Sequence, residues 1–312
     1  MLDQFLSTLI TVTALLLIAA PGYLMIKFKM LSNDCISGFS KVLLYVCQPC
    51  LAIYSFSTIE FSAKKIIELG IFALLTLGVM TLMLVGTYLV LRRRQKQPIY
   101  RIMTIATTFA NCAFFGIPII RSVMGEAADG LIVYTTVFAL VMNIIGWTVG
   151  AAIISRNMNY ISVKKIFLNP ATLGVCAALV FFIFSIPIEP NIGNMISVTG
   201  NMCTPLSMLI MGMRLGTMEL KSLFTNVRVY ITVAVKMIVM PLLAFAFVYF
   251  LPLSSEVKMT FYIISACPTA SVVLNFAEIV GDGQKEAAAM VLTCTILSVA
   301  IMPVMMLLLP LL

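Results

Sequence analysis

The chain has 312 residues, of which 62% are hydrophobic and only 10% are charged, and its mean hydropathy is +1.10. A soluble globular domain is nearer half apolar and a quarter charged, so this composition cannot build a solvated surface. A soluble enzyme and a disordered chain are therefore excluded, and a helical membrane protein remains. One span needs about 20 apolar residues and its loop about 10, so the length accommodates about ten spans.

The residue types also exclude several chemistries. The sequence has no histidine, which removes His-based acid–base catalysis, Ser-His-Asp triads and histidine proton relays. An intramembrane enzyme is further disfavoured because there is no G-x-S-x-G motif and no deep acid pair. The net charge of +8 indicates basic loops facing an anionic cytoplasmic leaflet rather than a nucleic-acid partner. We expect no cofactor and no metal ion.

Two short patterns near the N-terminus resemble other functions but are interpreted as parts of membrane helices. The stretch Cys47-Gln48-Pro49-Cys50 has the spacing of a redox motif, yet it lies in an apolar run without a βαβ context. Residues 1–4 carry no basic region before the first apolar run, and that run is long enough to span a membrane. We therefore expect a retained first helix rather than a signal peptide.

Apolar runs bounded by charged or turn residues predict ten helices. In chain order they cover residues 5–26, 36–58, 66–91, 101–124, 130–154, 170–188, 193–213, 226–250, 258–280 and 285–309. Residues 1–155 would hold the first five helices, 156–169 a short cytoplasmic loop, and 170–312 the last five.

The basic residues are unevenly divided between the predicted loops. Fifteen of the twenty lie in or near odd-numbered loops, four lie in or near even-numbered loops, and Lys236 lies within a helix. Because basic loops stay in the cytoplasm, both termini are expected on the extracytoplasmic side. The fifteen are Lys27, Lys29, Lys41, Arg92, Arg93, Arg94, Lys96, Arg101, Arg156, Lys164, Lys165, Arg214, Lys221, Arg228 and Lys285, and the four are Lys64, Lys65, Arg121 and Lys258.

The predicted halves suggest an inverted repeat. Five is an odd number, so two similar five-helix halves must insert with opposite topologies, as in many transporters. Pro49 and Pro205 are 156 residues apart in the second helix of each half, and Pro118 and Pro268 are 150 apart in the fourth. The predicted fold class is an all-α membrane protein with a 5+5 inverted repeat.

The fourth and ninth predicted helices each contain a proline near the middle, Pro118 and Pro268. Proline removes a backbone hydrogen bond, and in lipid the freed carbonyls need a partner. Two interpretations stay open: ordinary kinks, or crossed unwound segments whose half-helix N-terminal ends attract an anion. The candidate substrate-binding residues are Asn111, Cys112, Gly116, Pro118, Pro268, Thr269, Ser271 and Asn275.

Lys236 lies about eleven residues into the helix predicted over 226–250. A lysine at that depth costs roughly 2.5–3.5 kcal/mol on insertion scales, so it should have a partner or a task. Three interpretations compete: it snorkels to an interface, it pairs with an acid such as Glu278, or it stands beside the helix interruptions as a fixed cation. We favour the fixed cation, which would compensate negative half-helix ends or attract an anionic substrate.

Glu278 is the only acid clearly inside a predicted span. Cation antiporters and sodium symporters usually need carboxylates deep in the core, so their absence argues against sodium or proton exchange as the main activity. Glu278 itself is either a helix-end acid facing the cytoplasm or a proton-linked gate.

Several motifs resemble the auxin efflux carrier family, which includes the plant PIN carriers and many bacterial relatives. The stretch from Asn111 to Gly125, with Gly-Ile-Pro at 116–118, is similar to the PIN motif N-T-L-V-M-G-I-P-L-L. Asn169-Pro170-Ala171-Thr172 resembles the motif N-P-N-T-Y but lacks its second Asn and is followed by Leu173.

The second half carries two more matches. Lys236 with Pro241 resembles a basic residue and a proline of PIN helix 8, and Pro268, Phe276 and Ala277 resemble the pattern P-x7-F-A of helix 9. The central loop of about 15 residues is much shorter than the phosphorylated loop of plant PIN carriers, which suggests a bacterial-type member.

The resemblance implies a fold and an activity. The fold would be a ten-helix inverted repeat with crossed fourth and ninth helices, like the sodium/proton antiporter NhaA and bile-acid symporters. The activity would be transport of small organic anions by an elevator movement. The resemblance also implies a homodimer formed through the first, second, sixth and seventh helices.

The sequence therefore predicts a secondary transporter that exports a small organic anion, such as an auxin-like carboxylate, from a bacterial cell across its inner membrane. Asn111 and the half-helix ends near Pro118 and Pro268 would bind the carboxylate, and Lys236 would supply fixed charge, with Glu278 as a candidate coupling residue. The main alternative is a sodium- or proton-coupled permease for a dicarboxylate. A receptor or passive channel is a further alternative.

Overall fold

The computed structural model describes residues 1–157, 159, 164, 168–219 and 225–312. Most of the predicted loop 156–169, including Lys165, and also Lys221 lie outside the described residues. Within the described residues the fold is all helical, apart from one isolated antiparallel β-bridge between Ala110 and Thr269.

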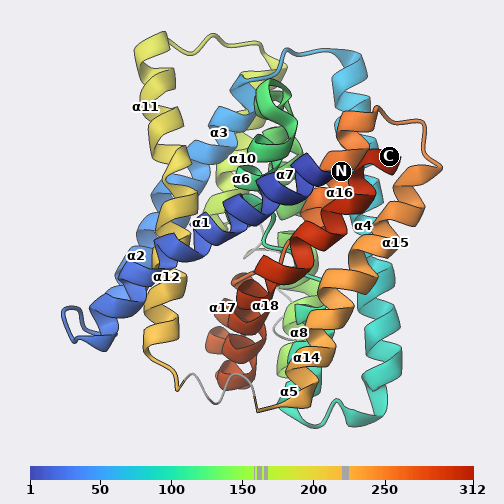
Figure 1. Cartoon of the computed structure of the whole chain (residues 1–312). Coiled ribbons are helices and arrows are strands. Elements are labelled where there is room, and N and C mark those ends of the chain that lie inside the picture. Colours follow the sequence, from blue (N-terminus) through green and yellow to red (C-terminus); the bar gives the residue numbers. More distant parts are fainter. Residues whose placement is uncertain (158, 160–163, 165–167, 220–224) are drawn as a thin grey trace.

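The first half of the chain forms a series of helices and short helical turns (Figure 1). They are α1 (Leu2–Lys27), α2 (Cys35–Val42), η1 (Leu43–Cys47), α3 (Gln48–Ser57), α4 (Ala63–Leu91), η2 (Arg92–Arg94), α5 (Pro98–Ala106), η3 (Cys112–Gly116), α6 (Ile117–Met124), η4 (Gly125–Ala127), α7 (Ala128–Ile145), η5 (Gly146–Gly150) and α8 (Ala151–Ser155).

The second half continues in the same way. Its described elements are α10 (Pro170–Ile183), α11 (Pro190–Asn201), α12 (Cys203–Gly216), α14 (Val227–Ala234), η7 (Val235–Val239), α15 (Met240–Tyr249), α16 (Ser255–Ala266), α17 (Val272–Val280), α18 (Gln284–Met305) and η8 (Met306–Leu311).

Side chains that cap helix N-termini explain where several of these helices begin. The hydroxyl of Ser62 accepts a hydrogen bond from the backbone N–H of Lys65 before α4, over 3.1 Å. Glu189 accepts one from the N–H of Ile192 at the start of α11, over 3.0 Å. Each cap satisfies a backbone donor that the first helical turn leaves without a partner.

Seven helical stretches among the described residues are long and apolar enough to cross a membrane. The predicted count of ten spans stays a prediction, because the fourth and ninth helices are interrupted and α10 ends at Ile183 rather than at the predicted residue 188. The seven stretches are Leu2–Lys27, Cys35–Ser57, Ala63–Arg94, Cys112–Ser155, Pro190–Gly216, Val227–Tyr249 and Gln284–Leu311.

Three of the π-helical turns each end two residues before a proline. The turns η1, η3 and η7 are followed by Pro49, Pro118 and Pro241, respectively. A proline lacks an N–H and its ring clashes with the carbonyl four residues earlier, and a wider π turn relieves that clash. These prolines therefore lie within continuous helical stretches and do not end them.

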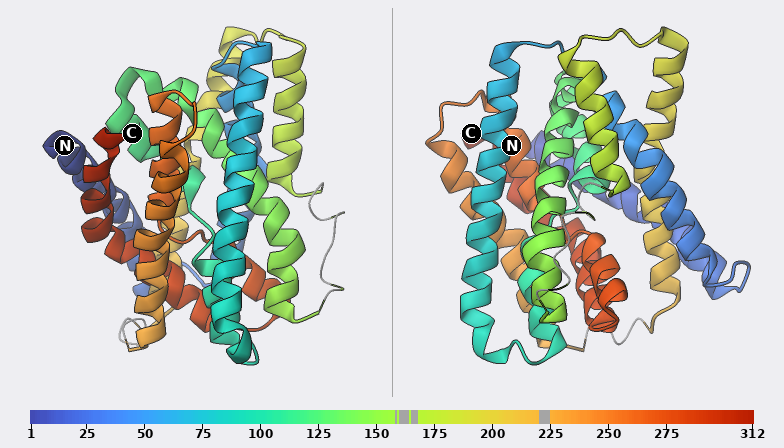
Figure 2. Two further views of the ribbon diagram at one scale, coloured as in Figure 1. Left: turned by 90° about the vertical axis from the view of Figure 1, so that its right-hand side faces the viewer. Right: turned by 180° about the vertical axis from the view of Figure 1, so that it is seen from behind.

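The helices fall into two flanks, which are visible from the front and from behind (Figures 1 and 2). Helices α3, α10 and α11 lie side by side at one flank, and α4, α14 and α15 lie at the opposite flank. The interrupted segments α5–α6 and α16–α17 lie between the flanks.

Helices α1 and α12 pack closely because each presents a glycine to the backbone of the other. A Cβ atom added to Gly212 would lie 1.8 Å from the carbonyl oxygen of Ala19, and one added to Gly22 would lie 2.1 Å from that of Leu209. Small residues let membrane helices approach backbone to backbone, where van der Waals contact replaces the missing hydrophobic driving force. We refer to α1, α2–α3, α10 and α11–α12 as the frame.

The remaining helices form a second packed body around an aromatic cluster. Phe72 of α4 packs against Tyr134 of α7 and Phe261 of α16, with ring centroids 4.8 Å and 5.3 Å apart. All three side chains are fully buried. The cluster joins helices from both halves of the sequence, and we refer to α4–α8 and α14–α18 as the inner body.

Candidate functional site

The two interrupted segments of the inner body are joined by their backbones. Helix α5 ends at Ala106 and helix α16 at Ala266, and the next few residues of each are not helical. The N–H of Asn111 donates to the carbonyl of Pro268 over 2.8 Å, and the N–H of Ala270 donates to the carbonyl of Phe109 over 3.0 Å. The interruptions therefore satisfy part of each other's backbone hydrogen bonding in a region where water is scarce.

Side chains satisfy the carbonyls at the ends of both upstream half-helices. The hydroxyl of Thr269 donates to the carbonyl of Ala106 over 2.9 Å. The ammonium of Lys236 donates to the carbonyl of Ser265 over 2.8 Å. These carbonyls carry the negative end of the helix dipole, so a cation placed beside one of them is stabilising.

Lys236 is fully buried within the π-helical turn η7. Its partner is the Ser265 carbonyl, whereas Glu278 pairs with Arg214. Lys236 is absent from the lining of the pocket beside the interruptions. Lys236 is therefore placed to compensate the negative end of the α16 half-helix, which is one of the two tasks expected of a fixed cation.

A narrow pocket lies where the interruptions face the frame. Its volume of about 40 Å³ holds one or a few water molecules, not an organic acid. The inner body contributes Asn111, Phe114, Ser271, Leu274, Asn275, Val291 and Leu292, and the frame contributes Ser40, Leu43, Leu44, Ser207, Ile210, Met211 and Arg214.

Asn111 lines this pocket and carries an unused donor beside it. The residue is only 4% exposed, and its buried Nδ2 atom has no hydrogen-bond partner. Ser271 stands at the start of α17, and its hydroxyl makes no capping hydrogen bond. The N–H groups of Val273 and Leu274 already donate to the carbonyls of Ala270 and Ser271, so this first turn attracts an anion through the positive end of the α17 dipole.

Arg214 is the charged residue among the described residues that line the pocket, and the sequence prediction did not place it there. The predicted helix ended at residue 213 and left Arg214 in a basic loop, but α12 continues to Gly216. The guanidinium donates to Glu278 over 2.5 Å and to the side-chain oxygen of Asn275 over 3.5 Å. A usable signal was the apolar Met213 and Leu215 on either side of Arg214, which extends the helical run past this position.

The predicted site residues are distributed in three places. Asn111, Ser271 and Asn275 meet in the pocket, and Pro268 and Thr269 form the backbone pairing behind it. Cys112 and Gly116 lie in the buried turn η3, where Gly116 faces Cys267, and Glu278 reaches the rim through Arg214.

The position of the first interruption differs from the prediction. The non-helical residues are 107–111, whereas Pro118 lies in the first turn of α6. The π turn η3 accommodates Pro118, so the helix breaks ahead of this proline and not at it. The half-helix end near Asn111 is consequently the one beside the pocket.

The sequence profile described as "Membrane transport protein", the domain of the auxin efflux carriers, matches residues 7–161 and 154–306. These stretches together span nearly the whole chain. The chain belongs to the auxin efflux carrier family. No curated protein matches the sequence.

Membership in the auxin efflux carrier family confirms the resemblance predicted from the sequence motifs. This is a family of transporters and not of enzymes, and the chain is a multi-pass membrane protein. The pocket and the paired interruptions therefore lie in a transport protein.

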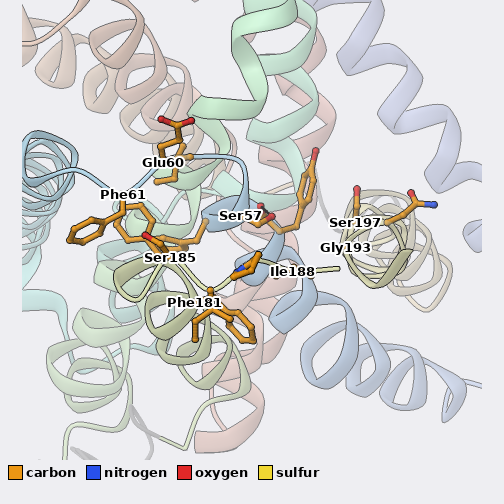
Figure 3. A pocket seen from close by; sticks show the side chains of 15 residues that line it. Ser57, Glu60, Phe61, Phe181, Ser185, Ile188, Gly193 and Ser197 are labelled. Atoms are coloured by element: carbon orange, nitrogen blue, oxygen red, sulfur yellow. Dashed lines mark hydrogen bonds between the residues drawn. The ribbon is translucent and has the colours of Figure 1, made fainter. Parts of the chain in front are cut away.

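A second, larger cavity of this family member lies at the ends of α3 and α10 and the start of α11 (Figure 3). Its volume is about 680 Å³. Phe182 packs edge-on against Phe56 and Phe61 in its wall, and Glu60 is the only charged residue among the described residues that line it. The described lining holds this one carboxylate and no basic residue, which does not suit an anion, so the narrow pocket is the better candidate of the two.

A polar bridge joins the inner body to the frame near the junction of α11 and α12, at Asn201. Arg121 of α6 donates to the side-chain oxygen of Asn201 over 3.1 Å and to Asp129 over 3.4 Å. The hydroxyl of Tyr54 on α3 also donates to Asp129, over 3.3 Å.

Proposed function

We propose that this family member is a secondary transporter of a small organic anion. The observation that carries the proposal is the pocket between frame and inner body. In it the free amide of Asn111, the first turn of α17 and the guanidinium of Arg214 converge. Donors and positive charge meet there on an apolar background, as a carboxylate with a small organic tail requires.

The carboxylate would be held by donors that already exist in the pocket. The Nδ2 atom of Asn111 would donate one hydrogen bond, the hydroxyl of Ser271 would donate another, and the positive end of the α17 dipole would add attraction. The apolar part would contact Phe114 and Leu274. Thr269 and Pro268 would act indirectly, by keeping the interruption in shape.

Lys236 would support the site without touching the substrate. Its ammonium neutralises the carbonyl end of α16. The nearby positive charge would also favour an anion in the pocket over a neutral molecule. We propose that this fixed charge replaces the deep carboxylates and bound cations of ion-coupled transporters, so that transport is not strongly coupled to a cation.

Transport would follow an elevator movement in which the inner body slides along the frame. The pocket lies at the boundary between the two, and its 40 Å³ would correspond to a closed state without substrate. Opening on alternate sides would then move the anion across the membrane. We propose export as the direction.

The proposed membrane arrangement is ten spans in two inverted repeats, residues 1–155 and 170–312, with the interrupted segments crossing. The two family matches meet near residues 154–161, which supports a division there. The basic residues of the odd-numbered loops support termini outside the cytoplasm of a bacterial inner membrane. A homodimer through the frame is also proposed.

The test is counterflow in proteoliposomes preloaded with unlabelled carboxylates and exposed to the labelled acid. Saturable counterflow is expected, with the same rate whether or not sodium and proton gradients are present. A rate that is linear in concentration would indicate a channel and contradict the proposal. A rate that requires either ion gradient, above all for malate, would favour the coupled dicarboxylate permease instead.

A further inference from the structure

We propose that Arg214 is the residue that receives the substrate's carboxylate, and that Glu278 occupies this guanidinium while the transporter is empty. Glu278 would thus act as a built-in competitor of the substrate. The inference rests on the proposed function, because it assigns the charge recognition and the resting state of that same pocket.

Arg214 is placed for ligand recognition rather than as a surface ion pair. Its side chain is 17% exposed and lines the pocket together with Asn111 and Ser271. Two of its nitrogens point at α17, one at Glu278 and one at Asn275. A guanidinium is a planar fork that matches the two oxygens of a carboxylate, so a substrate could replace both contacts at once.

Glu278 has the freedom that a competitor needs. Its side chain is 46% exposed, and its described partner is Arg214 alone. After release it would be solvated at the rim, so exchange would not leave a buried unpaired carboxylate. Arg214 itself keeps a partner throughout the exchange, first Glu278 and then the substrate.

The exchange would also alter the contact between frame and inner body. Arg214 belongs to α12 of the frame, and Glu278 to α17 of the inner body, so their ion pair spans the boundary. A substrate carboxylate that takes the place of Glu278 would free α17 from this contact. Neutral analogues of the substrate could not do so, because they do not compete for the guanidinium.

The chain contains one tryptophan, and its position makes the exchange measurable. Trp147 packs edge-on against Phe276 of α17, with ring centroids 4.8 Å apart. Phe276 is two residues from Glu278 in the same helix. A movement of α17 would therefore change the surroundings, and the fluorescence, of Trp147.

The experiment follows Trp147 fluorescence of the full-length protein in lipid nanodiscs during titration with butyrate, benzoate and malate. Benzamide serves as the uncharged analogue of benzoate. The variants are Glu278→Gln, Arg214→Gln, Arg214→Lys and Asn111→Ala. The matched control is Asp282→Asn, because Asp282 is 47% exposed and pairs with Arg101 over the same 2.5 Å without lining the pocket.

Replacement of Glu278 and replacement of Arg214 should change the apparent Kd for a carboxylate in opposite directions. Glu278→Gln should lower the apparent Kd for the best carboxylate about tenfold, and Arg214→Gln should raise it by about tenfold or more. The Kd of Arg214→Lys should lie between those of wild type and Arg214→Gln, since lysine keeps the charge but lacks the planar fork of donors. Asp282→Asn should leave the Kd unchanged, and benzamide should respond to none of the variants.

Folding is checked by thermal unfolding of each variant. If Arg214→Gln does not fold, Glu278→Gln and Arg214→Lys still test whether Glu278 competes with the substrate for Arg214. An unchanged or raised Kd in Glu278→Gln would overturn the competitor role, even if Asn111→Ala weakens binding and the proposed function stands. If neither wild type nor Glu278→Gln binds any of the three carboxylates, the proposed function fails together with this inference.

Discussion

The backbone N–H of Asn111 donates to the carbonyl oxygen of Pro268, 157 residues further along the chain, over 2.8 Å. Asn111 thus joins the two helix interruptions through its main chain, while its side-chain Nδ2 stays unpaired beside the pocket. The main chain of Asn111 serves the fold and its side chain is available for recognition. Replacing the side chain therefore tests substrate recognition without removing the backbone hydrogen bond.

Replacement of Asn111 by alanine should weaken substrate binding while the fold is kept. The backbone bond to Pro268 remains, and the only groups lost are the amide oxygen and the unpaired Nδ2. Loss of one hydrogen bond to a charged ligand corresponds to about 1.5–3 kcal/mol, or roughly a ten- to hundredfold rise in Kd. Counterflow at increasing substrate concentration measures this rise, and an unchanged half-saturation would remove Asn111 from the site.

Replacement of Lys236 by alanine or methionine should abolish transport and leave folding nearly intact. The carbonyl of Ser265 would lose its donor, but the cost of burying an ammonium would be lost as well. Methionine keeps most of the volume of the side chain without the charge, so it separates the effect of charge from that of volume. Counterflow gives the activity, and size-exclusion chromatography gives the folded fraction. Wild-type transport by the methionine variant would contradict the role of the charge.

Replacement of Thr269 by valine should destabilise the inner body. Valine keeps the shape but removes the hydroxyl that donates to the carbonyl of Ala106. A buried carbonyl left without a partner costs about 1–3 kcal/mol. Thermal unfolding of Thr269→Val should therefore occur at a lower temperature than that of Thr269→Ser, which keeps the hydroxyl. Equal unfolding temperatures would mean that this hydrogen bond adds nothing.

Replacement of Gly212 by alanine should separate α1 from α12. The new methyl group would overlap the carbonyl oxygen of Ala19, and such overpacking costs about 1–3 kcal/mol or more. The matched control is Gly78→Ala in α4, where an added Cβ meets nothing within 4 Å. The yield of monodisperse protein and its unfolding temperature should fall for Gly212→Ala only. A similar fall in both variants would point to a general intolerance of helix glycines.

Hydropathy and charge predicted the membrane class and many of the helices. The predicted range 5–26 agrees with α1 (2–27), and 226–250 agrees with α14–α15 (227–249). These predictions succeed because a membrane helix must be apolar over its whole length, which a single sequence displays directly. The family resemblance, based on motifs in both halves, was confirmed by the family profile.

The local geometry of the site was less predictable from sequence. Pro118 was expected either to kink the fourth helix or to lie in an unwound segment, but the π turn η3 accommodates Pro118 and the helix is interrupted ahead of it, at residues 107–111. Hydropathy does not reveal where the helix is interrupted, because the interruption at Asn111 depends on its hydrogen bond to the carbonyl of Pro268 in a distant segment. Arg214 was missed for a similar reason: a basic residue near a helix end resembles a loop residue until the opposing Glu278 is known.

Two of the polar contacts between frame and inner body lie on α11–α12: Arg121 with Asn201 near the middle of this stretch, and Arg214 with Glu278 near its end. If one of these contacts breaks in the outward-facing state and the other in the inward-facing state, each opening removes a different contact. The difference in their strengths would then set which side the empty protein faces at rest, since a two-state population follows the free-energy difference between its states. A change of about 1.4 kcal/mol in one contact would shift that population ratio tenfold.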